Sequence, residues 1–96
     1  MGQFSVSVYT NRHEDRSEGN HAVIELKLTA NPNEAAGDFQ SLSDMINTLQ
    51  YPLAIFINIA STKTYIHLAP EQAIGRLVCF ATTLNNGRAD VVEDQT

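Results

Sequence analysis

The sequence has a single cysteine, few basic side chains and no long apolar run within its 96 residues. One cysteine excludes an internal disulfide framework and favours a reducing compartment. Six Lys and Arg stand against eleven Asp and Glu, for a formal net charge of −5. Direct nucleic acid binding is not expected, because it needs a concentrated basic face. No apolar run approaches the roughly 18 residues of a membrane span, and no secretory signal is recognisable, so we expect a cytoplasmic protein that does not bind membranes.

Residues arranged for catalysis are equally sparse. The five glycines are scattered along the chain and form no phosphate-binding loop. Cys79 is expected to be a buried, inert thiol. Glu14 and Asp15 are adjacent acids in a loop, where no enclosed cleft would separate their pKa values. The sequence therefore predicts no catalytic residue and no cofactor, and it leaves open whether His13 and His21, which flank the same loop, bind a metal.

Two segments near the N-terminus alternate apolar and polar residues, which is typical of half-buried strands. They cover residues 4–9 and 22–29, and the charged residues 10–21 between them predict a long loop. The two strands most simply pair as an antiparallel hairpin. In the second strand the alternation directs one set of side chains to the core, namely Ala22, Ile24, Leu26 and Leu28. Glu25 and Lys27 would then face outward.

The rest of the chain predicts two helices and two further strands. Apolar residues recur at steps of three and four between Asp38 and Gln50, which predicts a helix after the strand-ending Asn31-Pro32-Asn33. The isoleucine-rich residues 53–60 predict a buried strand, and residues 64–68 predict its returning neighbour. Pro70 is suited to the first turn of a second helix, which would extend to Leu84.

The predicted order is therefore β-β-α-β-β-α. Its simplest solution is an α+β fold, a single four-stranded, mostly antiparallel sheet with both helices on one face. Asn85-Asn86-Gly87 would stop the second helix, so a single compact domain would cover residues 1–87. The acidic residues 88–96 would form a flexible C-terminal tail.

Strand phases place a mixture of aromatic and polar side chains on the sheet face away from the helices, which resembles the core and rim of an interface. With the acids of the charged loop they give the candidate partner-binding residues: Tyr9, Glu14, Asp15, Glu18, Glu25, Phe56, Asn58, Tyr65 and His67. Tyr9, Phe56 and Tyr65 would be the anchors. An ordinary amphipathic sheet with a few outward aromatics would show the same pattern.

A small acidic domain without a cofactor is suited to docking on a larger protein, because complementary charge speeds encounter and sets orientation. The sequence therefore predicts a non-catalytic protein-binding module, most simply an inhibitor such as an immunity protein, an antitoxin or a phage anti-defence protein. In the last case the larger protein partner would handle nucleic acid, and Glu14, Asp15, Glu18 and the acids of the tail would fill a basic groove meant for phosphates. Two alternatives stay open. One is a homodimer assembled through the open sheet face or an edge strand, and the other is a small ligand- or metal-binding domain or enzyme that uses the charged loop.

Overall fold

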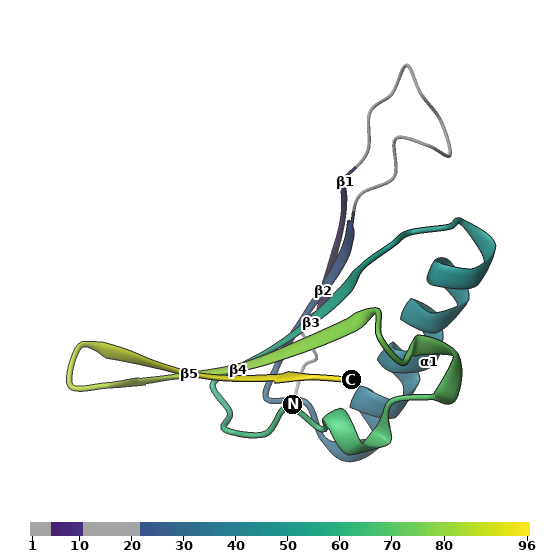
Figure 1. The fold of residues 1–96 in the computed structure, drawn as a ribbon. Helices are drawn as coiled ribbons and strands as arrows, with labels where there is room; N and C mark the ends of the chain where they lie inside the picture. The colour runs from purple at the N-terminus through teal and green to yellow at the C-terminus, as the bar shows by residue number, and fades with distance from the viewer. Residues whose placement is uncertain (1–4, 11–21) are drawn as a thin grey trace.

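The structure, a computed structural model, describes residues 22–96 and the backbone of residues 5–10. It shows one compact α+β domain built on a five-stranded sheet with the strand order β1-β2-β3-β4-β5 (Figure 1). The strands are β1 (Ser5–Thr10), β2 (Ala22–Leu28), β3 (Ala54–Ile59), β4 (Leu77–Asn85) and β5 (Arg88–Gln95). The predicted antiparallel pairing of β1 with β2 is confirmed. β3 is parallel to both β2 and β4, whereas β5 pairs antiparallel with β4, so the sheet is mixed rather than mostly antiparallel.

The helix α1 (Pro32–Thr48) begins earlier than predicted. Asn31 and Pro32 were expected to end the preceding strand, but they also form the start of α1. The Asn31 side chain accepts a hydrogen bond from the backbone N–H of Glu34 at 2.8 Å, and the Glu34 carboxylate accepts one from the N–H of Asn31 at 2.9 Å. This is a capping box, and Pro32 fits the first helical turn because it has no N–H to satisfy there. The helix has 17 residues and is therefore about one turn longer than the predicted 38–50.

The predicted strand over residues 64–68 and the predicted second helix are both wrong. After β3 the chain forms two short 3₁₀ helices, η2 (Ile66–Leu68) and η3 (Glu71–Ala73), and then enters β4. Gly75, expected inside a helix, instead adopts φ +85° in the turn that leads into β4. Such a conformation ends helical geometry, and the β-branched and aromatic residues that follow favour a strand. The described part of the chain therefore has one α-helix, not two.

Residues 88–96 were predicted as a flexible tail, yet Arg88–Gln95 form the edge strand β5, paired with β4. Asn86 and Gly87 have φ values of 52° and 76°, and they connect Asn85 to its partner Arg88. Two successive residues with positive φ make the two-residue turn that matches the twist of a hairpin. The hairpin of β4 and β5 projects beyond the layer formed by α1 (Figure 1).

The core lies between the sheet and α1. The helical stripe predicted from the sequence is confirmed at Phe39, Leu42 and Ile46, which are buried, but not at its last residue, Leu49, which is 48% exposed. Phe39 packs its ring against Phe56 of β3 with the centroids 4.9 Å apart and the planes at 81°, a T-shaped contact. The other sheet residues of this core are Val23, Ala54, Leu77 and Cys79.

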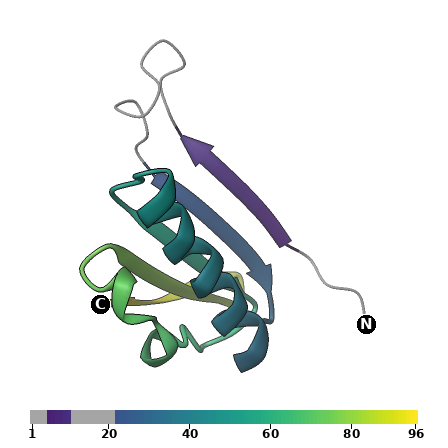
Figure 2. The same ribbon diagram turned by 90° about the vertical axis from the view of Figure 1, so that its right-hand side faces the viewer.

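Two connections join parallel strands: α1 joins β2 to β3, and the segment with η2 and η3 joins β3 to β4. The chain topology explains why both lie on one face of the sheet. Crossovers between parallel strands are almost always right-handed. Because β2, β3 and β4 are neighbours in chain order, both crossovers run in the same direction, so their right-handed paths fall on the same side. The contacts of α1 with η2 and η3 agree with this, and Figure 1 shows the described connections on the α1 side of the sheet, with no segment of residues 22–96 over the opposite side. Figure 2 views the sheet from the α1 side. We call that side the open face.

Candidate protein-binding surface

The side-chain phase of β2 is opposite to the prediction. Val23 and Lys27 are buried on the α1 side, and Glu25 is half-buried there. Ile24 and Leu26 therefore belong to the open face, because side chains alternate along a strand. The more apolar half of this strand is turned away from the only helix that the structure describes.

An ion pair between the sheet and α1 accompanies the inverted phase of β2. The Nζ atom of Lys27 lies 3.3 Å from Oδ2 of Asp38 on α1, and the two side chains are 10% and 17% exposed. Burial raises the pKa of the Asp38 carboxyl above its usual range, and the positive charge of Lys27 opposes the shift. Glu25 and Glu34 raise the pKa further by repulsion. The ion pair therefore offsets part of the cost of burying Lys27 and Asp38 between the sheet and α1.

The open face carries aliphatic and aromatic side chains aligned across three strands. Strand register places three rows side by side: Ile24, Ile55 and Val78; then Leu26, Ile57 and Phe80; then Leu28, Ile59 and Thr82. Directly opposed side chains on one face of a sheet pack against one another. Mutual packing leaves most of these side chains half-buried, while Leu28 at the margin is 46% exposed. No ionisable side chain of β2, β3 or β4 lies on this face.

The apolar surface continues onto the hairpin of β4 and β5. Leu84 is 74% exposed and Val91 is 59% exposed. Val91 is the partner of Thr82, so both lie on the open face, and Leu84 follows Thr82 at the next outward position. Glu93, opposite Phe80, brings a charge only at the edge strand. The surface is therefore apolar in its middle and acidic at one border.

Two of the predicted binding residues lie in the interior. Phe56 and Asn58 are both 0% exposed, so the prediction that they lie on an exposed face is wrong. They point toward α1 because they share the phase of Ala54 in β3. The Asn58 amide accepts a hydrogen bond from Ala30 N–H at 2.8 Å and donates one to the Lys63 carbonyl at 2.9 Å, which ties two loops to β3.

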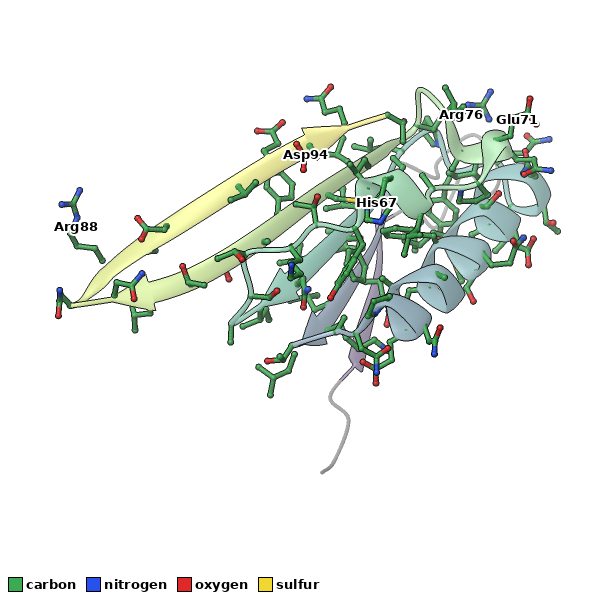
Figure 3. All side chains as sticks on the ribbon, turned by 90° about the horizontal axis from the view of Figure 1, so that it is seen from below. His67, Glu71, Arg76, Arg88 and Asp94 are labelled. Carbon is green, nitrogen blue, oxygen red and sulfur yellow. The ribbon has the colours of Figure 1, made fainter. Side chains whose placement is uncertain are left out.

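The remaining predicted residues do not form one surface with the open face. Tyr65 packs against the α1 core and its ring lies 6.4 Å from that of His67. His67 is exposed, but on the α1 side of the sheet (Figure 3). Glu25 lies on that side too. The loop residues Glu14, Asp15, Glu18, His13 and His21, and the side chain of Tyr9, lie outside the described residues.

Other features offer less to a ligand. A hollow of about 470 Å³ lies at the C-terminal end of α1, lined by Asn47, Tyr51, Arg76 and their neighbours, and none of the predicted binding residues within the described part of the chain lines it. Cys79 is buried as predicted, and burial raises its pKa to about 12. Among residues 22–96, no group of three or more His, Cys, Asp or Glu is placed to hold a metal ion.

Across β2, β3 and β4 the open face is thus an apolar surface without an ionisable side chain. None of the helices in the described ranges is both long and apolar enough to cross a membrane. Comparisons of the chain with models of protein families, with curated proteins and with solved structures found no match.

Proposed function

We propose that this protein is a non-catalytic protein-binding module and that the open face is its binding surface. The observation that carries the proposal is the inverted phase of β2, which directs Ile24 and Leu26 away from α1 and Lys27 toward it. Register normally places the apolar side of a strand on the covered face. The inversion is understandable if the open face is itself covered in the functional state.

The parallel strands support the same proposal. Parallel sheets are as a rule covered on both faces, and their strands are apolar on both sides. β3 has this character, since Ile55, Ile57 and Ile59 alternate with buried residues. A large apolar patch on a small protein is typical of an interaction site. The chain itself covers the parallel strands only on the α1 side. A partner protein on the open face would cover the other side, as is usual for parallel sheets.

The proposal is tested by placing the photoreactive residue p-benzoylphenylalanine at position 57 in living cells, with position 40 as the control. Ile57 lies in the middle of the open face, and Gln40 is exposed on α1. The expected result is one dominant cross-linked protein species from position 57 and none from position 40. No protein adduct from position 57, or equal adducts from both, would overturn the proposal.

The same experiment addresses the inhibitory role predicted from charge. A docked partner with a basic groove would be captured as a second, larger protein. The open face of β2 to β4 has no charge to steer such a partner, and Glu25 is half-buried on the α1 side. Inhibition of a larger protein therefore stays a prediction, decided by the identity of the captured species.

A further inference from the structure

We infer that the open face is covered by the open face of a second copy of this chain, in a face-to-face homodimer of α–β–β–α layers. The inference rests on the proposed function and names the partner. Three observations carry it: the absence of charge on the open face of β2 to β4, the central position of the apolar rows, and the size of the sheet.

Charge separates a second copy from other partners. Each chain has a formal net charge of −5, so the repulsion between two copies is smallest when their charged groups lie away from the contact and are screened by salt. Across β2, β3 and β4 the open face is neutral. The ion pair of Lys27 with Asp38 lies on the other side of the sheet, between β2 and α1. A basic partner would find no carboxylate there to pair with, and burying its charges unpaired would be unfavourable. A matching neutral aliphatic surface has no such penalty.

The apolar rows are also placed for two-fold symmetry. β3 is the middle strand of the five, and Ile57 is central in the middle row. A two-fold axis that runs midway between the two open faces, at the position of β3, places β3 of one copy over β3 of the other. Isoleucine then meets isoleucine, flanked by Leu26 and Phe80, at the spacing of about 10 Å that stacked sheets adopt.

The area is sufficient for a specific contact. Five strands spaced about 4.8 Å apart, each at least six residues long at about 3.3 Å per residue, span roughly 480 Å² of flat sheet. Contact between two copies would bury close to the roughly 1,000 Å² of accessible surface that a specific interface needs. The protruding side chains add further area to this estimate for a flat sheet. The hairpin of β4 and β5, with the exposed Leu84 and Val91, extends the surface beyond that.

Sedimentation equilibrium of the whole chain tests the inference, with Ile57→Lys and the matched control Gln40→Lys. We expect the wild type and Gln40→Lys to sediment as dimers, and Ile57→Lys to dissociate with a dimer constant weakened roughly 30-fold or more. Circular dichroism and a cooperative melt show whether Ile57→Lys remains folded. Because that variant places a charge on a half-buried position, Ile57→Cys with a short bismaleimide gives a second measurement. Covalent dimers are expected from Ile57→Cys and not from Gln40→Cys, since the buried Cys79 does not react.

The outcomes distinguish the two proposals. A wild type that stays monomeric at high concentration overturns the homodimer, as does an Ile57→Lys variant that stays dimeric. If the wild type is monomeric while the photoreactive residue at position 57 captures a different protein, the binding function stands and the second copy is wrong. If it captures nothing, both are wrong.

Discussion

Phe56 gives the sharpest test of which side of β3 forms the core. Its side chain is 0% exposed and meets the Phe39 ring at 4.9 Å. Truncation to alanine removes a buried aromatic ring and leaves a cavity, which costs about 3–5 kcal/mol, of which the aromatic pair supplies about 1 kcal/mol. A domain of this size is stable by only about 5–15 kcal/mol. We therefore expect Phe56→Ala to lower Tm by at least roughly 12 °C, at about 4 °C per kcal/mol.

Phe80→Ala is the matched control, because it removes the same side chain from the neighbouring strand on the opposite face. Urea unfolding followed by circular dichroism, at several chain concentrations, separates the two effects. The loss in Phe56→Ala is expected to be independent of concentration, whereas Phe80→Ala acts through association and its effect on the midpoint varies with concentration. A loss below about 1 kcal/mol in Phe56→Ala would refute the assignment of the core side.

Three further changes probe the ion pair, the thiol and the hairpin turn. Lys27→Met leaves the Asp38 carboxylate buried without its partner and should cost about 3 kcal/mol in urea unfolding, while adding Asp38→Leu should recover most of it; equal stability of the single and double variants would contradict this. Burial raises the pKa of Cys79 from 9.0 to about 12, so its stabilising contribution is complete below pH 9 and is lost as the pH rises toward 12. The stability difference between wild type and Cys79→Ser should shrink over that range, and a constant difference would count against it. Gly87→Ala, at φ +76°, should lower stability by about 1–2 kcal/mol, and no measurable change would exclude a strained turn.

Local sequence patterns predicted the first half of the fold well. The hairpin of β1 with β2, the strand β3 and the buried stripe of α1 all follow from periods of two or of three to four residues. The start of α1 was misread because Asn31-Pro32 also stops strands. Glu34 three residues after Asn31 completes the capping box, and this was the signal that could have located the start.

The second half was misread because residues 70–84 are compatible with two periods. A run of small and apolar residues does not distinguish a helix from a buried strand. Val78, Phe80 and Thr82 favour a strand, and Asn86-Gly87 is a strong signal for a hairpin. With Asn86-Gly87 interpreted as a helix stop, β5 had no partner and was predicted as a tail.

The residues of the open face could not be predicted, because the alternation in β2 gives two faces and does not show which of them α1 covers. We assigned Ala22, Ile24, Leu26 and Leu28 to the core on the assumption that only one face of the sheet is covered. In the structure the opposite set, Val23 and Lys27, is buried on the α1 side, where Lys27 pairs with Asp38, a residue distant in sequence. Long-range charge pairing of this kind leaves no periodic pattern in the chain. The same reversal moved Phe56 and Asn58 into the interior.

The central claim is that the open face meets a second copy of itself, and intermolecular NOEs to isoleucine methyl groups measure this directly. A sample would mix chains carrying ¹³C-labelled isoleucine methyls with unlabelled chains. We expect contacts between copies at Ile55, Ile57 and Ile59. None is expected at Ile46, which is buried on the side of α1 that faces the sheet. An absence of such contacts on β3, or contacts confined to Ile74, which is 62% exposed outside this face, would contradict the claim.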